Sequence, residues 1–394
     1  MHAQSDGDSF AAANRNSGID ALRGLSIILV IFNHVGIRIP LAKTALADFA
    51  PAWLLRGLNW NGYEAVCVFF VISGFLITRK SLQRWGELRQ VSLRGFYLLR
   101  ASRIVPTLLL VVMLLSLLHL LGVANFVIHG KDQSLGAAIA AALGLYLNWY
   151  EGTTGYLPGG WDVLWSLSIE EVFYLAFPLV CLGLGSRRWL LVLALSGLAL
   201  SLPYTHAANA GNEIWYEKAY WPGMSAIAIG VLTALLAVRT APPRSWVAPV
   251  LCLLGIFGLG SVLFASSAVW QWLHEGYGFV LTASAAALVL GLHWQAGGES
   301  PWRLRGLGWL RSCGRLSYEI YLFHMFCVFG VLAVANRFGV GEFAFLWYVP
   351  VLALSWLFGL AIARGFSEPC ERWLRCRFAT RLHASIGWIG RAAA

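Results

Sequence analysis

The sequence has few charged residues and no cysteine pattern that would build a covalent or metal framework. Asp, Glu, Lys and Arg make up only 12% of its 394 residues, whereas soluble proteins average about 25%. The seven cysteines form no C-x-x-C pair and most lie inside apolar runs, so neither a disulfide framework nor a zinc site is expected. Because 58% of the residues are hydrophobic, we expect a polytopic membrane protein.

Basic residues outnumber acidic ones and give a formal net charge of +10. They lie between apolar runs rather than together on one soluble segment, so no nucleic-acid partner is expected. Ten apolar windows are long enough to cross a lipid bilayer. These windows are 24–39, 64–79, 104–123, 164–184, 188–203, 220–238, 246–266, 277–294, 317–335 and 344–364. The predicted fold class is an all-α polytopic membrane protein with about ten transmembrane helices.

The distribution of lysine and arginine predicts how these helices are oriented. If the N-terminus is inside, all but six of the 29 basic residues fall in inner segments, as the positive-inside rule requires. The six exceptions are Arg38, Lys43, Arg56, Lys131, Lys218 and Arg337. A shorter window, 135–149, would reverse this bias as a full crossing, so we expect a re-entrant segment beside an outer vestibule.

Three parts of the chain are expected on these grounds. They are a disordered cytoplasmic tail (1–18), a membrane domain (19–373) and a basic cytoplasmic tail (374–394). A cleaved signal peptide is the alternative for the first apolar run, because Arg15 and Arg23 precede it and Ala-Leu-Ala follows. The length of the run and the many later windows favour a retained first helix.

The first window carries a histidine near the middle of the predicted membrane. His34 follows Arg23 by eleven residues, which is about 16 Å along a helix. If Arg23 marks the edge of a hydrocarbon layer about 30 Å thick, the imidazole lies near mid-depth. An ionisable group there is costly, so His34 is a candidate functional residue facing the bundle interior.

A stripe of polar residues follows the window that begins near Trp165. Ser166, Glu170 and Tyr174 recur at i, i+4 and i+8 and share one helix face, whereas Glu171 points about 100° away. The two carboxylates are predicted to lie roughly 9 Å inside the outer boundary. A carboxylate satisfied by a helix N-terminus is the alternative, but two adjacent ones exceed what capping requires.

A second stripe lies in the window from 317 to 335. Ser317, Tyr321 and His324 fall at i, i+4 and i+7 and are predicted to face the same way. His324 is placed about 10 Å in from the cytoplasmic end. A catalytic part and a histidine bonded to a neighbouring helix are both open interpretations.

Basic residues gather where the third helix begins. Arg100 and Arg103 lie one turn apart and can bind phosphate through forked hydrogen bonds. Anchoring to anionic lipid headgroups is the alternative. Asp20 precedes Arg23 by three residues, so these two are expected to pair. Ser73 lies inside the second window, where close helix packing is the favoured interpretation.

Several of these segments, taken in order, resemble the acyltransferase-3 family of integral membrane acyltransferases, which modify bacterial surface and exported glycans. The matching segments are IDALRGLSIILVIFNH, FFVISGFLIT, RASRIVP, WSLSIEEVFYLAFP, SYEIYLFH and EPCERW, and they cover about 18 to 373. The resemblance implies that His34 is the central catalytic histidine. It further implies that Arg100 and Arg103 handle the acyl donor and that Glu170 and Glu171 are site carboxylates.

The resemblance implies a function that the residues alone do not give. We expect transfer of an acyl group, most simply acetyl, from cytoplasmic acyl-CoA to a hydroxyl of an extracytoplasmic or lipid-linked glycan. Exopolysaccharide and lipopolysaccharide are candidate acceptors, polysaccharide biosynthesis proteins are candidate partners, and the expected location is the bacterial inner membrane. No metal is expected.

The expected site includes a base, a donor-binding group and further lining residues. His34 would act as general base or carry the acyl group, and a carboxylate would orient its ring. Arg23 would join the paired arginines at the donor phosphates. Further pocket candidates are Asp20, Asn33, Ser73, Trp165, Ser166, Tyr174, Ser317, Tyr321 and His324.

A carrier or flippase for lipid-linked sugars is the competing hypothesis. Its buried polar residues would bind substrate without chemistry. Pseudo-repeats between the two halves would favour a transporter, and none is evident in the sequence. Many relatives carry an additional SGNH-type esterase domain, for which we expect no room in this chain, so a separate partner could complete the transfer.

Overall fold

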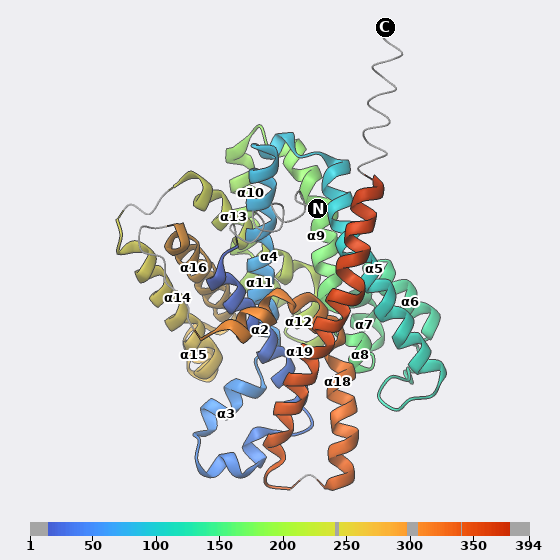
Figure 1. Ribbon diagram of the computed structural model, residues 1–394. Coiled ribbons are helices and arrows are strands. Elements are labelled where there is room, and N and C mark those ends of the chain that lie inside the picture. Colours follow the sequence, from blue (N-terminus) through green and yellow to red (C-terminus); the bar gives the residue numbers. More distant parts are fainter. Residues whose placement is uncertain (1–14, 241–243, 298–305, 340, 379–394) are drawn as a thin grey trace.

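The computed structural model describes residues 15–240, 244–297, 306–339 and 341–378, and these form helices and their connections without a strand (Figure 1). Ten helical segments in this part of the chain are long and apolar enough to cross a membrane. Each overlaps one of the ten predicted windows, which confirms the all-α class. Seven of the ten are built on α2 (Ser17–Gly36), α4 (Gly62–Trp85), α5 (Leu93–Leu120), α9 (Trp165–Leu184), α13 (Tyr220–Arg239), α14 (Val247–Phe264) and α18 (Ser317–Phe338). The other three are built on α10 (Arg188–Leu200), α16 (Tyr277–Gly297) and α19 (Tyr348–Ile362).

Side-chain caps explain where two of the long helices begin. The Asn16 side-chain oxygen accepts hydrogen bonds from the amides of Gly18 and Ile19 at 2.9 and 3.1 Å, satisfying donors that a helix start leaves free. Ser92 caps α5 through the amide of Gly95 at 3.1 Å. The first helix therefore begins at Ser17, inside the expected tail. The remainder of that tail, 1–14, and positions 379–394 lie outside the described residues.

Small residues let α4 and α13 pack backbone against backbone. A Cβ atom added at Gly74 would overlap the carbonyl oxygen of Ile227, and one added at Gly230 would overlap that of Val71. Such close approach is how membrane helices gain packing energy where lipid offers no hydrophobic driving force. The segment around Ser73 therefore does serve packing, on the side of the helix that carries Gly74.

The short apolar window 135–149 does not form a long helix. It is divided between α6 (Leu135–Leu143) and α7 (Leu147–Thr154), and Leu145 between them has a positive φ of 64°. A helix needs about 20 residues to cross a bilayer, so neither piece is long enough. The depth of this segment relative to the bilayer stays a prediction.

The two ends of the bundle differ in the residues they carry. We call the end where α4 stops and α5 starts the basic end, because residues 79–103 there include seven lysines and arginines. The start of α2 lies at the same end, at Arg15 and Asn16. The opposite end carries α3 (Ala52–Asn59), which joins α2 to α4, and the turn between α18 and α19 (Figure 1).

Candidate active site

His34 lines a cavity of about 570 Å³ toward the opposite end of the bundle. Its side chain is half-buried, in the last turn of α2. We call this space the His34 cavity. Three other predicted residues, Asn33, Trp165 and Tyr321, also line it. Helices distant in the sequence thus bring these four side chains around one space.

A second histidine lies beside His34. The ring centroids of His34 and His324 are 5.1 Å apart, and the His324 side chain is fully buried. His324 Nδ1 is 2.7 Å from the carbonyl oxygen of Tyr321. Because a carbonyl only accepts, Nδ1 carries the hydrogen, and Nε2 of the neutral ring is an acceptor. That Nε2 is buried without a hydrogen-bond partner among the described residues.

The wall between α9 and α18 is fixed by hydrogen bonding and ring packing. The Ser166 hydroxyl donates to the Tyr321 hydroxyl at 2.7 Å. The Trp165 ring meets Phe70 of α4 edge to face, with centroids 6.1 Å apart. Ser166 therefore positions Tyr321, which in turn holds His324 through its carbonyl oxygen.

A separate cavity of about 180 Å³ lies toward the basic end. We call it the basic cavity. Six cationic side chains line it, together with the carboxylates of Asp20 and Glu170; the six are Arg15, Arg23, Arg79, Lys80, Arg100 and Arg103. The three arginines predicted to bind the donor therefore meet in one cavity, although they come from two helices.

Glu170 belongs to the basic cavity and not to the surroundings of His34. Its carboxylate accepts a hydrogen bond of 3.0 Å from Tyr174, whose hydroxyl is also 3.0 Å from that of Ser73. The guanidinium of Arg100 lies 5.3 Å from the centre of the Tyr174 ring. Ser73, Tyr174 and Glu170 thus form a polar wall against which Arg100 is held.

The expectation that Glu170 or Glu171 orients His34 is not met by the structure, which gives neither carboxylate a contact with that ring. The physical reason is where the helix begins. A helical turn, α8 (Gly159–Asp162), precedes α9, so Glu170 lies about 16 Å from the start of the span rather than 9 Å. Glu171 carries a buried carboxylate oxygen that has no hydrogen-bond partner among the described residues.

Asp20 and Arg23 do not form the expected ion pair within 4 Å in the part of the chain that the structure describes. Arg23 donates instead to the Ser317 hydroxyl at 2.7 Å, because its side chain turns inward toward α18. Asp20 pairs with Arg15 at 3.4 Å, just outside the helix start. Arg23 is thereby tied to the helix that carries His324.

A buried ionic cluster at the His34 cavity has no counterpart among the predicted site residues. Lys218 Nζ lies 2.9 Å from Glu151 Oε2 and also pairs with Asp162. Glu151 accepts the amide of Leu157 at 3.0 Å, and the Lys218 ammonium lies 4.3 Å from the Tyr156 ring centre. Burial raises the pKa of the Glu151 carboxyl above its ordinary value. The sequence does contain a signal for Lys218, because it is one of only six basic residues that fall outside the predicted inner segments.

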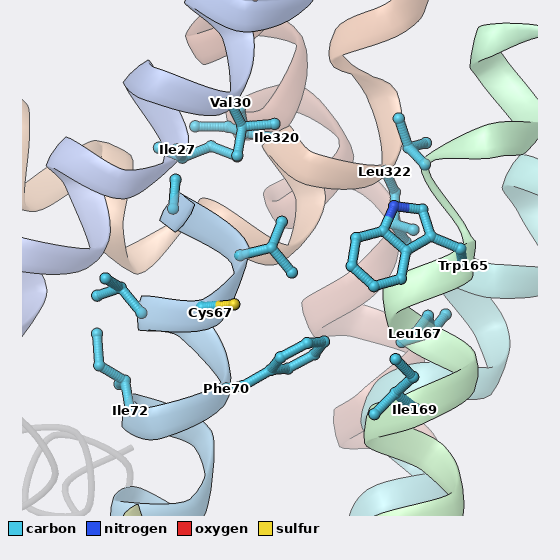
Figure 2. Close-up of a cluster of buried hydrophobic side chains, with 14 of the residues drawn as sticks. Ile27, Val30, Cys67, Phe70, Ile72, Trp165, Leu167, Ile169, Ile320 and Leu322 are labelled. Atoms are coloured by element: carbon cyan, nitrogen blue, oxygen red, sulfur yellow. The ribbon is translucent and has the colours of Figure 1, made fainter. Parts of the chain in front are cut away.

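Residues that line one cavity lie close to residues that line the other along α9 and α18, and the buried apolar side chains there form a layer between the two cavities. On α9, Trp165 lines the His34 cavity and Leu167 lines the basic cavity. These two residues are about 3 Å apart along the helix axis. On α18, Tyr321 lines the His34 cavity and Tyr318 lines the basic cavity. They are about 4.5 Å apart along the helix axis. Figure 2 shows Phe70 extending from α4 toward Trp165 and Ile169 of α9.

These features define a class of protein. A bundle of ten potential membrane helices encloses ionisable side chains, and such residues inside a membrane mark substrate pathways or reaction sites. A family model described as an acyltransferase domain matches residues 16–364. The chain belongs to the acyltransferase-3 family and is a multi-pass membrane protein, which confirms the resemblance seen in its motifs.

Individual relatives are distant but cover most of the chain. "Putative O-acetyltransferase SACOL0978" of Staphylococcus aureus (strain COL) is 23% identical over 380 residues. "O-acetyltransferase OatA" of Staphylococcus aureus (strain NCTC 8325 / PS 47) is 22% identical over the same length. In both cases the alignment covers 90% of this chain and 57% of the relative, so the chain spans little more than half the length of these curated relatives. No solved structure matches the chain.

Proposed function

We propose that this protein is a membrane-embedded O-acyltransferase that moves an acetyl group from acetyl-CoA at its basic end to a glycan hydroxyl at the opposite end. The observation that carries this proposal is the thin apolar layer between a cationic cavity and the His34 cavity. This arrangement would hold a phosphorylated donor on one side and a neutral sugar on the other, with the reacting groups meeting where the two cavities come closest. Family membership supports O-acyl transfer in general.

The basic cavity suits the donor. Arginine pairs bind phosphate through forked, charge-assisted hydrogen bonds, and Arg23, Arg100 and Arg103 all line this space. Part of its wall is apolar and includes Phe69 and Ile72, which suits the extended pantetheine arm. A donor anchored by its phosphates would direct its thioester toward the layer in front of His34.

The His34 cavity suits a sugar. Its volume falls within the range of about 300 to 1,000 Å³ that is usual for small-ligand sites. Aromatic rings and carboxylates share its wall, so hydroxyls can be bonded while rings cover the sugar's apolar face. The rings are Trp60, Tyr63, Tyr156, Trp165, Tyr277 and Tyr321, and the carboxylates are Glu64, Asp162, Glu213 and Glu217.

The transfer itself needs one base. His34 takes the proton of the acceptor hydroxyl, the oxygen attacks the thioester carbonyl, and the carbon–sulfur bond breaks. The departing thiolate then receives the proton from the imidazolium. Acyl transfer through His34 itself is an alternative that uses the same groups. His324 acts as a positioning residue, because its free Nε2 can accept the N–H of His34 and so select the tautomer that leaves a basic nitrogen toward the substrate.

The location follows from the same proposal. Acetyl-CoA is a cytoplasmic metabolite, so the basic end and both termini lie in the cytoplasm of a bacterium, in agreement with the positive-inside rule. The acceptor is then an exported or lipid-linked glycan, such as exopolysaccharide or lipopolysaccharide. Polysaccharide biosynthesis proteins would supply it.

The decisive assay uses purified protein in vesicles with radiolabelled acetyl-CoA and a glycan acceptor. Wild-type protein should transfer label to the glycan, and His34→Ala should reduce transfer by at least about 100-fold, as removal of a general base does. His129→Ala, which changes an exposed histidine, is the matched control and should behave as wild type. Movement of glycan across the vesicle without label would instead identify a carrier.

A further inference from the structure

A third cavity, of about 370 Å³, adjoins the basic cavity and shares Lys80, Arg100 and Arg103 with it. It lies where α4 ends and α5 begins. Arg84 and Arg375 add two further positive charges to its wall, and Trp85 and Phe96 supply aromatic rings. We call it the Trp85 cavity.

The Trp85 cavity combines positive charge with an accessible aromatic ring. No acidic side chain lines it among the described residues. Glu87, the next acidic residue along the chain, is held by Arg89 at 2.5 Å and by Arg188 at 3.5 Å. The guanidinium of Arg84 lies 5.7 Å from the Trp85 ring centre. The cavity wall thus carries an excess of positive charge beside an aromatic surface, and Arg375 also pairs with Glu371, which does not line the cavity.

The partners of Trp85 leave part of its indole open. Its ring packs against Phe96 with centroids 6.3 Å apart at 38°. Phe96 is buried, whereas Trp85 is half-buried. A planar ligand can therefore stack on Trp85, and nucleobases stack on aromatic side chains whatever their sequence. Guanidinium groups add cation–π attraction at the same place.

We propose that the Trp85 cavity binds the nucleotide end of coenzyme A, with adenine stacked on Trp85 and the 3′-phosphate held by Arg84 and Arg375. This inference rests on the proposed function, since it assigns the donor's distal half. The shared cations Lys80, Arg100 and Arg103 then meet the pyrophosphate at the border of the two cavities. The pantetheine arm continues into the basic cavity toward His34.

Two donors differ only at the proposed contact. Acetyl-dephospho-CoA has the same thioester, pantetheine and adenine as acetyl-CoA but lacks the 3′-phosphate. Hydrogen bonds to charged groups are worth about 1.5 to 3 kcal/mol each, which is about 10- to 100-fold in affinity. Wild-type protein in neutral phosphatidylcholine vesicles should therefore prefer acetyl-CoA by at least about 10-fold in kcat/KM.

The test compares this preference between variants. The double variant Arg84→Gln, Arg375→Gln should have a kcat/KM for acetyl-CoA as low as that of wild-type protein for acetyl-dephospho-CoA. Its kcat/KM for acetyl-dephospho-CoA should equal that of wild-type protein. Arg94→Gln, an exposed arginine on the same helix start, should retain the full preference. Equal losses with both donors, or no loss with either, would overturn the assignment.

A binding measurement separates this inference from the proposed function. Adenosine 3′,5′-bisphosphate should bind wild-type protein in calorimetry and should bind Trp85→Ala and the double arginine variant at least about 10-fold more weakly. If acetyl-CoA supports no acyl transfer but adenosine 3′,5′-bisphosphate binds as described, the proposed function is wrong and the assignment of the Trp85 cavity as a nucleotide site is retained. Absence of binding to wild type, or an arginine effect seen only in anionic vesicles, would show a lipid-headgroup contact instead.

Discussion

At the scale of single residues, the proposed mechanism rests on the pair His34 and His324. His324 Nδ1 is occupied by the Tyr321 carbonyl oxygen, so only Nε2 is open. In a straight N–H···N bond of about 2.9 Å between two imidazoles, the ring centres lie about 5 Å apart. The observed 5.1 Å matches this separation, although Nε2 of His324 makes no hydrogen bond among the described residues, so a small turn of the rings is needed to form the bond.

Two amide substitutions test this positioning role. Gln at 324 can place an oxygen near the former Nε2 position, whereas the shorter Asn cannot. His324→Asn should lower kcat by about 10- to 100-fold with KM for both substrates unchanged, and His324→Gln should recover most of the loss. Steady-state kinetics in vesicles would measure both. Equal activity of the two variants would contradict the role.

Lys218 provides a second prediction, concerning stability. It is buried between two carboxylates, and removing one partner of a buried ion pair typically costs about 3 to 5 kcal/mol. Lys218→Met should therefore lower the thermal midpoint in detergent by several degrees. Lys131→Met, at an exposed lysine, is the control and should leave it unchanged. A stable Lys218→Met protein would mean that the cluster contributes little to folding.

The sequence was sufficient to select several side chains but not to pair them. Spacing brought out His34, Arg100 and Arg103 because cations and a histidine are rare in apolar runs. The contact between Arg23 and Ser317 depends on how α2 faces α18. This relative orientation cannot be derived from the spacing of residues in one sequence. The pairing of Asp20 with Arg15 likewise depends on the turn before the helix.

At the scale of elements, helix ends decide which residues share a cavity. The ten helices long enough to cross a membrane were predictable from the sequence, because apolar runs of that length have few other stable folds. Proline and glycine are typical of turns, yet Pro158 stands directly before the helical turn that begins at Gly159, where its missing N–H costs nothing. That extra turn moves Glu170 from the expected outer position into the basic cavity.

Packing of α4 against α13 yields a third prediction. Because a Cβ at Gly230 would overlap the Val71 carbonyl oxygen, Gly230→Ala must move the two helices apart, at a cost of about 1 to 3 kcal/mol. A lower thermal midpoint in detergent should report it. Gly183→Ala, where an added Cβ meets nothing within 4 Å, should not be destabilised. Equal midpoints for the two variants would show that the interface is looser than described.

At the scale of the whole molecule, the two cavities open the bundle from opposite ends. This division predicts that the two ends face different compartments. Single-cysteine variants at Arg187 and Lys131, tested with a membrane-impermeant thiol reagent, should be labelled from the cytoplasm and from outside respectively. Labelling of both from one side would remove the basis for transfer across the layer.

The most direct test is the sidedness of the reaction. Proteoliposomes of uniform orientation would receive radiolabelled acetyl-CoA only at the basic end and glycan acceptor only at the opposite end. We predict label on the glycan with wild-type protein and none with His34→Ala. Label appearing only when donor and acceptor share one compartment would contradict transfer through the layer beside His34.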